Sequence, residues 1–270
     1  MRVCTLLTDF GLRDWYLGVM KGTLLRLAPG TVLVDLGHQV DPGDVATAAL
    51  LLAASAPVFP EGTVHLAVVD PGVGSSRRML AARVGGQVCV APDNGLLDCL
   101  LAGATDPAPA ARAAPVHAIE RPDLYLESAG QTFHGRDRFA PVAAALLVGA
   151  SLESLGPPID DPVTLGLPPP AFDRGRGRIT GRVVHVDRYG NLITDVPVRW
   201  IERELLRARV GTLEVRRRAT HYAEVDHGEP ALVVGSLGTL ELALRDQSAA
   251  AATGIARGAP VTIDLAAPER

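Results

Sequence analysis

The residues best suited to chemistry follow an apolar run early in the chain. Positions 64–69 are rich in β-branched residues, which predicts a buried strand. The strand ends at Asp70, and the Pro-Gly-Val-Gly turn after it lets the backbone approach a ligand closely. Arg77 and Arg78 follow in the same loop. A carboxylate, free backbone amides and a guanidinium group can together hold a polar ligand, although a turn with a surface ion pair explains the same residues.

Three further aspartates, each followed closely by glycine, end other predicted strands: Asp9, Asp35 and Asp93. If these strands are parallel, their carboxyl ends meet at one edge of the sheet, where open α/β sheets bind ligands. Each aspartate alone is more simply a turn former or a helix N-cap. Together with Asp70 they favour a cleft that binds hydroxyl groups or a cation.

One histidine, His134, is a further candidate. It stands in the run Phe-His-Gly-Arg-Asp, ahead of a helical pattern at 139–148. A lone histidine at the start of a helix is usually a capping or packing residue. The adjoining Gly, Arg and Asp raise the odds of a functional role to about even. The chain has no G-x-G-x-x-G, P-loop or G-x-S-x-G motif, so the usual dinucleotide, triphosphate and serine-hydrolase sites are not indicated.

The elements that must position these residues alternate between strand and helix in the first half of the chain. Strands are predicted at 2–7, 31–34, 64–69 and 87–90, and helices at 15–27, 45–56 and 139–148. This alternation predicts an α/β N-terminal domain at 1–165, with a mostly parallel sheet flanked by helices.

The pattern changes after a Pro- and Gly-rich linker, predicted at 166–177. Short strands are predicted beyond it at 178–186, 212–217, 231–234, 239–244 and 260–265, with a helical turn near 198–207. This pattern predicts a smaller all-β C-terminal domain at 178–270, a barrel or a sandwich.

Composition narrows the classes of protein that fit. The 270 residues carry a formal charge of −4, which argues against a nucleic-acid-binding protein. The cysteines Cys4, Cys89 and Cys99 are scattered, which predicts neither a disulfide framework nor a zinc site and fits a reducing cytoplasm. The longest apolar run, 46–59, is too short to span a membrane, and no secretory signal is evident. We therefore expect a cytoplasmic protein without a membrane anchor or a bound metal.

Five short motifs occur in a fixed order along the chain. They are Leu-Thr-Asp-Phe-Gly at 7–11, Val-Asp-Pro-Gly-Val-Gly at 69–74, Ala-Pro-Asp-Asn-Gly at 91–95, Phe-His-Gly-Arg-Asp at 133–137 and Asp-Arg-Tyr-Gly-Asn at 187–191. In this ordered set the chain resembles the S-adenosyl-L-methionine (SAM) hydroxide adenosyltransferases, also called SAM hydrolases, over nearly its whole length. These enzymes are related to the SAM-dependent fluorinases and chlorinases.

The resemblance implies hydrolysis of SAM to adenosine and L-methionine, by attack of a water-derived oxygen on C5′ of the ribose. SAM is the substrate, and neither a cofactor nor a metal is implied. The family's catalytic set corresponds to Asp70, Arg77 and His134, since Arg77 has the family's seven-residue spacing from the aspartate. Because methionine leaves a sulfonium as a neutral group, the protein has to orient and partly deprotonate a water molecule. The sequence leaves open which residue takes the proton.

The resemblance also implies a homotrimer, in which SAM lies between the N-terminal domain of one subunit and the C-terminal domain of the next. Asp9 would then hold the ribose hydroxyls, a suitable task for a two-oxygen acceptor. Asn191 would read the adenine edge, and Tyr189 would pack against the adenine ring.

The methionine end of SAM is implied to contact three further residues. Asp14 and Asp187 would lie near its ammonium group, and Ser236 near its carboxylate. The chain departs from its relatives here, because the halogenating enzymes have Arg where this chain has Leu237, and Arg245 stands where Asn is common.

Two other functions stay open from the sequence. A SAM-dependent halogenase, giving 5′-halo-5′-deoxyadenosine, is disfavoured because those relatives carry Tyr, Thr and Ser in place of Asp70, Val73 and Gly135. An anionic carboxylate would repel a halide ion at short range. A SAM- or adenosine-binding protein without turnover is the second alternative, but it would not need the catalytic set at C5′.

Overall fold

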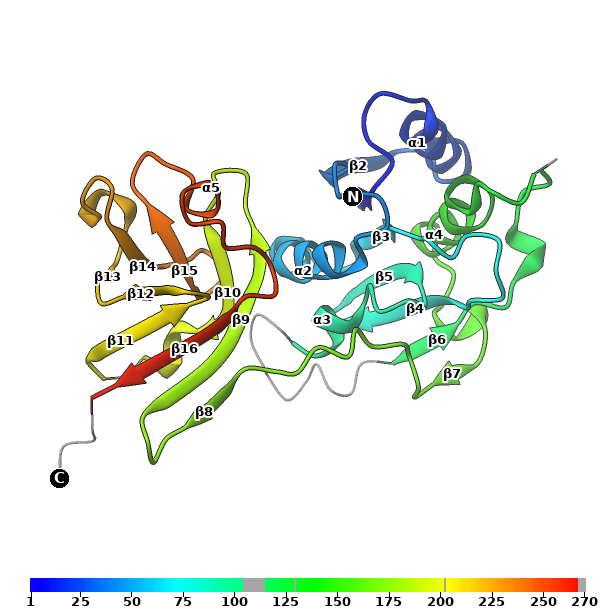
Figure 1. The fold of residues 1–270 in the computed structure, drawn as a ribbon. Helices are drawn as coiled ribbons and strands as arrows, with labels where there is room; N and C mark the ends of the chain where they lie inside the picture. The colour runs from blue at the N-terminus through cyan, green and yellow to red at the C-terminus, as the bar shows by residue number, and fades with distance from the viewer. Residues whose placement is uncertain (104–114, 129, 202, 267–270) are drawn as a thin grey trace. The chain divides into compact units, whose positions relative to one another are not determined.

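The computed structural model describes residues 1–103, 115–128, 130–201 and 203–266 (Figure 1). The chain forms two compact units, Met1–Gly166 and Leu167–Arg270. Each unit has its own sheet and its own hydrophobic core. The first unit carries helices on its sheet, whereas the second consists mainly of strands.

The N-terminal unit is built on a seven-stranded sheet in the order β2-β1-β3-β5-β4-β6-β7. Its strands are β1 (Arg2–Thr8), β2 (Thr31–Gly37), β3 (Val64–Val68), β4 (Met79–Val84), β5 (Gln87–Pro92), β6 (Val116–Ala118) and β7 (Pro158–Ile159). β2, β1, β3 and β5 are parallel, whereas β4, β6 and β7 pair antiparallel with their neighbours. The sheet is therefore mixed, and the prediction of a mostly parallel sheet is corrected.

β4 is the first strand along the chain that pairs antiparallel with its neighbours. Its sequence, MLAARV, contains two alanines, which weakens the strand signal. The chain returns from β4 as β5 through Gly85 and Gly86, whose φ angles are +56° and +81°. Two positive φ angles are what a tight type I′ hairpin turn requires. A two-residue turn can join only antiparallel strands, because a parallel pair needs a long crossover.

Helices cover both faces of this sheet (Figure 1). They are α1 (Tyr16–Leu27), α2 (Val45–Ser55), α3 (Asp98–Leu101) and α4 (Ala140–Leu147). α1 and α4 share a core with Leu6, whereas α2 and α3 share a core with the next residue, Leu7. Neighbouring side chains of a strand point to opposite faces, so a strand buried on both sides reads as one continuous apolar run.

A π-helical turn, Gly135–Phe139, leads into α4. It takes up the start of the predicted helix and contains most of the Phe-His-Gly-Arg-Asp motif. His134 directly precedes this turn and is buried. Such wide turns are often found at functional sites.

The C-terminal unit has a nine-stranded sheet in the order β12-β11-β16-β9-β10-β15-β14-β13, with β8 also paired to β9. A short helix, α5 (Ala249–Thr253), accompanies it. The strands are β8 (Ala171–Asp173), β9 (Arg178–Val186), β10 (Leu192–Pro197), β11 (Leu205–Val210), β12 (Leu213–Val215), β13 (Arg218–Ala219), β14 (Pro230–Val234), β15 (Thr239–Leu244) and β16 (Pro260–Leu265). The strand-rich character predicted for this unit is confirmed.

β9 changes partners halfway along its length. Residues 178–182 pair with β16, and residues between 183 and 186 pair with β10. The sheet curls at this point around a core that contains Ile179, Val183 and Leu242. A strand shared in this way is how two sheet surfaces fold against each other.

Four strands of this unit, β8, β10, β11 and β13, were not predicted from the sequence. β8 lies inside the segment predicted as a linker and pairs antiparallel with β9. β13 directly follows the strand predicted at 212–217, β10 lies where the sequence predicts no element, and the start of β11 overlaps the turn predicted near 198–207. A 3₁₀ turn does form within that range, at Val198–Trp200.

Candidate active site

The carboxyl ends of β1 and β3 bring two of the candidate motifs together. The strands are parallel neighbours with Thr8 beside Val68, so Asp9 and Asp70 follow at the same edge. The backbone N–H of Gly43 donates to Oδ2 of Asp9 at 2.9 Å. A Cβ at Gly43 would lie 3.6 Å from Cβ of Pro71, so the same glycine is close to both loops.

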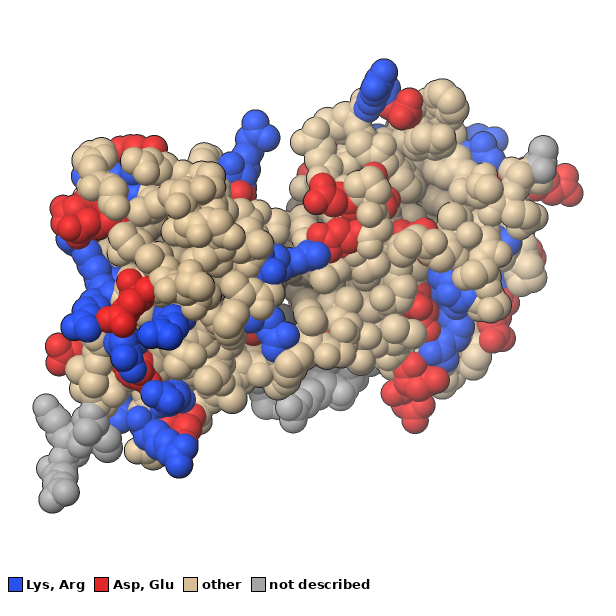
Figure 2. Space-filling model, viewed as in Figure 1, with Lys and Arg blue, Asp and Glu red and all other residues tan. Residues whose placement is uncertain are grey.

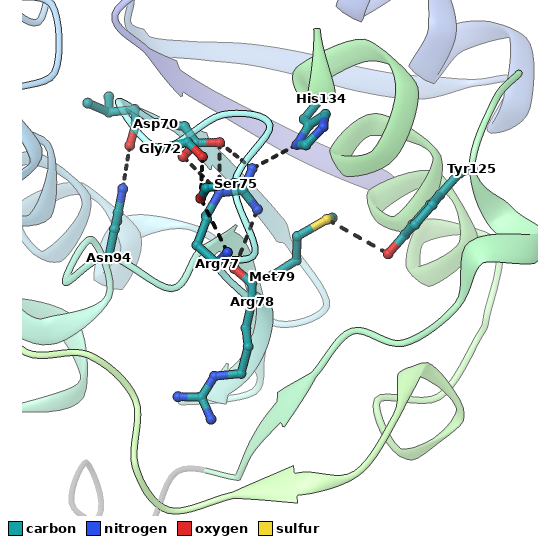
Figure 3. Close-up of polar contacts among 10 residues, drawn as sticks. Asp70, Gly72, Ser75, Arg77, Arg78, Met79, Asn94, Tyr125 and His134 are labelled. Carbon is teal, nitrogen blue, oxygen red and sulfur yellow. Dashed lines mark hydrogen bonds and ion pairs between the residues drawn. The ribbon is translucent and has the colours of Figure 1, made fainter. Parts of the chain in front are cut away.

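Asp70, Arg77 and His134 form one connected cluster (Figure 3). Nε of Arg77 donates to Oδ1 of Asp70 at 2.8 Å and to Oδ2 at 3.0 Å, and Nη2 makes a further short contact with Oδ2. The same Nη2 lies 3.0 Å from Nδ1 of His134. The side chains of Asp70 and Arg77 are only 4% and 10% exposed. Water therefore screens the pair weakly, and the bidentate geometry fixes its orientation.

The cluster holds His134 in one state. A guanidinium group only donates, so Nδ1 of His134 accepts and the neutral ring carries its proton on Nε2. Burial, and after it the positive charges of Arg138 and Arg77, lower the pKa of His134. The ring is thus neutral at neutral pH. Its Nε2 is buried without a hydrogen-bond partner among the described residues, which leaves an N–H free to donate to a ligand.

Aromatic rings pack around Gly135, the residue that follows this histidine. Gly135 lies so close to Phe10 that an added Cβ would be 3.1 Å from the ring. Phe10 and Phe133 meet edge to face, with ring centroids 5.9 Å apart. A serine at Gly135 would require the Phe10 ring to move. Since Phe10 belongs to the first sequence motif, three of the five motifs meet at the cluster.

A hollow of about 630 Å³ opens beside His134. Tyr125, Gln131, Asp137 and Arg138 also line it. Its polar lining gives room for water next to the cluster.

Arg78, the alternative partner in the sequence, turns away from Asp70 (Figure 3). Its Nε donates to Oδ2 of Asp93 at 2.6 Å, and its Nη1 donates to Oδ1 of Asp161 at 2.8 Å. Asp93 also accepts from the backbone N–H of Val163 at 2.8 Å. Arg78 and Asp93 therefore fasten the segment around 161–163 to the sheet, and the geometry selects Arg77 for the cluster.

Two other acidic candidates of this unit lie outside the cluster. Asp14 is exposed in the turn before α1. Asp35 lies in β2 and binds Nζ of Lys21 at 2.7 Å. Asp9, Asp70 and Asp93 follow β1, β3 and β5, whereas Asp35 lies inside β2 beside Leu6. The expected row of four aspartates at the strand ends is therefore reduced to three, and these have different partners.

In the C-terminal unit, the turn between β9 and β10 joins Asp187 and Asn191. Oδ1 of Asp187 accepts from the backbone N–H groups of Tyr189 at 2.9 Å and Asn191 at 2.8 Å. Nδ2 of Asn191 donates to Oδ2 of Asp187 at 3.0 Å. Tyr189 is 78% exposed, and Ser236 is exposed in the turn between β14 and β15. The structure thus joins two of these four predicted residues and leaves the other two at the surface.

Two residues that the sequence analysis missed extend this network. The hydroxyl of Tyr222 donates to Oε1 of Glu241, and Nδ2 of Asn191 lies 3.4 Å from the same hydroxyl. Burial raises the pKa of Glu241, which is 4% exposed. The sequence offered one signal for this pair, which is Glu241 within the apolar run TLELAL. A buried carboxyl needs a hydrogen-bond partner.

Figure 2 shows the charges on one face of the units. Acidic side chains gather on the N-terminal unit over the region of β2 and β3, and arginines gather on the C-terminal unit over β11 and β16. Two arginines of the C-terminal unit, Arg178 and Arg207, are paired, since they bind Asp264 at 2.7 and 2.9 Å. The visible face carries both signs of charge rather than one broad basic surface.

The described residues contain neither a candidate metal site nor a membrane-spanning helix. None of their His, Cys, Asp and Glu side chains form a group of three or more that could hold a metal ion. None of the described helices has the length and apolar character needed to cross a bilayer.

The fold and the cluster define a two-domain protein with an enzyme-like site at the strand ends of its α/β unit. Comparison with protein families gives its family. Residues 4–156 match the SAM hydroxide adenosyltransferase N-terminal domain, and residues 181–262 match the C-terminal domain. The chain belongs to the SAM hydroxide adenosyltransferase family.

Individual relatives agree with this assignment. A Thermus thermophilus protein named (R)-S-adenosyl-L-methionine hydrolase is 42% identical over 277 residues, which cover 97% of this chain and 100% of the relative. The crystal structure of an uncharacterized conserved protein from Thermotoga maritima aligns with a TM-score of 0.84 and 32% identity, covering 97% and 99% of the two chains. A fluorinase from an Actinoplanes species is 25% identical and covers 97% of this chain and 98% of its own. The named hydrolase is thus the nearer of the two enzymes.

Proposed function

We propose that this protein is a SAM hydrolase, which converts SAM and water to adenosine and L-methionine. The observation that carries the proposal is the assembled cluster of Asp70, Arg77 and His134, in a chain 42% identical to a protein named for this reaction. That relative is named for the (R) configuration at sulfur, and we propose the same preference here.

The reaction requires an oriented water molecule rather than a strong acid. Methionine leaves C5′ as a neutral thioether, so the leaving group needs no proton. The water must lie in line with the C5′–S bond and lose a proton as the new C–O bond forms. The cluster therefore has two tasks, which are to position the water and to accept its proton.

We assign proton acceptance to Asp70. Nδ1 of His134 is occupied by Arg77 and Nε2 carries a proton, so the ring can donate to the water but cannot take its proton. Asp70 supplies the carboxylate, and Arg77 holds that carboxylate in one orientation. The His134 N–H and the Arg77 charge then stabilise hydroxide character on the water.

We propose that SAM is bound by residues of both units, without a metal or other cofactor. Asp9 binds the ribose hydroxyls, Asn191 binds the adenine edge, and Tyr189 packs against the adenine ring. The ammonium and carboxylate groups of the methionine end are assigned to Asp14, Asp187 and Ser236. The exposure of Asp14, Tyr189 and Ser236 supports these roles, because each side chain is accessible to a ligand.

We propose a homotrimer in which each SAM site takes its N-terminal residues from one subunit and its C-terminal residues from the next. This is the assembly that the resemblance in the sequence implies. Leu12 and Trp15, which are 65% and 68% exposed next to Asp14, provide apolar surface that a neighbouring subunit can cover. A closed trimer makes three equivalent sites.

We propose that the protein is located in the cytoplasm, because its three cysteines fit a reducing compartment. Cys4, Cys89 and Cys99 are all free thiols, and the first two are buried. Secreted domains generally pair such residues as disulfides.

A halogenase is the first competing function, and the cluster disfavours it. A halide would have to bind beside the buried carboxylate of Asp70, which is 4% exposed and repels anions. Binding without turnover is the second, but a binding protein needs no donor and acceptor set of this kind.

Incubation of the purified protein with SAM, followed by chromatography, tests the proposal. We expect equal amounts of adenosine and methionine, undiminished by EDTA, with the (R) form of a diastereomer mixture consumed first. Chloride or fluoride should give no 5′-halo-5′-deoxyadenosine. Intact SAM after long incubation, or turnover lost with the chelator, contradicts the proposal. A halogenated product would assign the chain to the halogenase branch instead.

A further inference from the structure

A buried polar chain lies behind Asp9, the residue assigned to the ribose. Thr8 is fully buried and His38 is 4% exposed. Oγ1 of Thr8 lies 2.9 Å from Nδ1 of His38, and Nε2 of His38 lies 3.1 Å from Oδ1 of Asp35. The other carboxylate oxygen of Asp35 binds Nζ of Lys21 at 2.7 Å. The chain thus runs from a lysine on α1, through a carboxylate of β2, to the carboxyl end of β1.

Donor and acceptor chemistry fixes the direction of this chain. A carboxylate only accepts, so the proton of a neutral His38 ring belongs on Nε2, facing Asp35, although this contact falls short of hydrogen-bond geometry. Nδ1 then accepts from the Thr8 hydroxyl. The hydroxyl oxygen accepts in turn from the backbone N–H of Phe10 at 3.3 Å. The Thr8 hydroxyl therefore has a partner both as a donor and as an acceptor.

The segment that begins at His38 holds the backbone on both sides of Asp9. The His38 ring binds Thr8, and its carbonyl oxygen accepts from the N–H of Gly11 at 2.7 Å. The same segment continues to Gly43, whose N–H binds the Asp9 carboxylate itself. The residue before Asp9, the backbone after it and its own side chain are thus tied to one segment.

Thr8, His38 and Asp35 are the residue types of a nucleophile, base and acid triad, but this arrangement cannot act as one. Thr8 is inaccessible, and its oxygen is bound to the backbone of Phe10. What the three residues can do is hold the neighbouring loop.

We propose that Thr8 and His38 are positioning residues for the ribose-binding carboxylate of Asp9, an inference that rests on the proposed function. A carboxylate recognises a vicinal diol best when its two oxygens face the two hydroxyls, and a displacement of about 1 Å loses that match. Removal of the Thr8 hydroxyl frees the Phe10 N–H and the His38 ring, which both adjoin Asp9. The preference for ribose over 2′-deoxyribose then depends on Thr8.

The variant Thr8→Val tests this role, because valine keeps the shape and removes the hydroxyl. Binding of adenosine and of 2′-deoxyadenosine is measured by calorimetry, with Asp9→Ala as the reference for complete loss. We expect the unchanged protein to prefer adenosine by about tenfold or more, the effect of one well-made hydrogen bond. Thr8→Val should lose most of this preference, and Thr8→Ser should keep it within about twofold. In SAM turnover, Thr8→Val should raise KM more than it lowers kcat.

Thr31→Val is the matched control. Thr31 is also buried, donates to the carbonyl oxygen of Ala28 at 2.8 Å and stands beside the amino end of β1. It should leave the ribose preference unchanged. If thermal unfolding shows that Thr8→Val does not fold, Lys21→Met disturbs the chain from its exposed end and should cause a smaller loss of the same preference.

An unchanged preference in folded Thr8→Val, or in Lys21→Met where that variant replaces it, overturns the positioning role. An equal loss in Thr31→Val, or an equal loss of affinity for both nucleosides, does so as well. Failure of the proposed function gives a different result, because the unchanged protein then leaves SAM intact. The ratio of the affinities for adenosine and 2′-deoxyadenosine still tests the role of Thr8 in that case. An unchanged protein without ribose preference overturns both the assignment of Asp9 and its positioning.

Discussion

Substitution of Asp70 should distinguish the catalytic step from the binding of SAM. Asp70→Asn keeps the shape of the side chain and removes its charge and its capacity to take a proton. We expect kcat for SAM hydrolysis to fall by about 10²-fold or more, the range for positioned acid–base groups. The affinity for SAM should change little. Steady-state kinetics and calorimetry measure the two quantities.

Asp9→Ala is the contrasting variant. Asp9 is assigned to contacts with the ribose that exist in the ground state and the transition state alike, so its loss should raise KM and spare kcat. If both variants lose binding equally, the division of roles between Asp9 and Asp70 is wrong.

The pKa of His134 can be moved through Arg138. Burial and the charges of Arg138 and Arg77 lower this pKa, and the neutral ring is the form that accepts from Arg77. Activity should therefore fall as the pH falls through the pKa of His134. Arg138→Gln removes one positive charge and raises that pKa, so the acid limb of the kcat profile moves to higher pH.

The control for this shift is Arg121→Gln. Arg121 is a surface residue paired with Asp123, and it is not among the charges that act on His134. Its pH profile should match that of the unchanged protein. An acid limb that stays in place in Arg138→Gln would refute the neutral-ring role of His134.

The sequence predicted which residues form the cluster but not how they contact one another. Arg77 follows Asp70 by seven residues, so one local turn brings them together. His134 is 57 residues beyond Arg77, and its tautomer depends on how the π-helical turn packs against the sheet. The pairing of Tyr222 with Glu241 could not be predicted, since it depends on a loop folding over β15.

At the scale of the elements, a buried polar ladder crosses β1, β3 and β5. Nδ1 of His65 lies 2.7 Å from Oγ1 of Thr5, and Nε2 lies 3.1 Å from Oε1 of Gln87. The amide nitrogen of Gln87 donates to the carbonyl oxygen of Ala56 at 3.0 Å, so its oxygen accepts from the ring. His65 is therefore satisfied as a neutral residue.

This ladder predicts how stability depends on pH. Burial lowers the pKa of His65 from its ordinary value of 6.5. As the pH falls below that value, the unfolded chain takes up a proton before the folded chain does, so the free energy of unfolding decreases. His65→Gln keeps a donor and an acceptor but does not titrate, and its stability should fall less steeply with acid. Urea unfolding of both proteins at several pH values measures the difference.

His134 also has a lowered pKa, but it is present in both proteins and cancels in this comparison. Equal pH slopes for the unchanged protein and His65→Gln would mean that the ladder does not contribute.

The elements that the sequence predicts best are those with a regular pattern and clear ends. β9, β15 and β16 have the predicted bounds, and α1 and α2 agree within one residue. β4 and β10 were missed because alanines weaken one and an aspartate and a proline interrupt the other. The four strands predicted in the first unit are parallel, as expected, and the sheet is mixed because the antiparallel strands β4, β6 and β7 were not predicted.

At the scale of the whole molecule, the proposed site residues are divided between the two units. Asp9, Asp70, Arg77 and His134 belong to the first, and Asp187, Asn191 and Ser236 belong to the second. A ligand as large as SAM needs most of its surface buried, so we expect the proposed site to need both units, from the same chain or from a neighbour.

Mixed assemblies distinguish these two arrangements. One inactive chain carries Asp70→Asn, and the other carries Asp187→Ala with Asn191→Ala, so each keeps one unit intact. In the proposed trimer, an intact first unit of one chain can meet an intact second unit of the next. After the chains are unfolded and reassembled in equal amounts, random mixing gives about a quarter of the sites both intact units, and about a quarter of the unchanged activity should return. Each chain reassembled alone is the control and should stay inactive. A site built within one chain gives no recovery even when labelled subunits are shown to exchange, and a monomer seen by light scattering at active concentrations would also exclude the shared site.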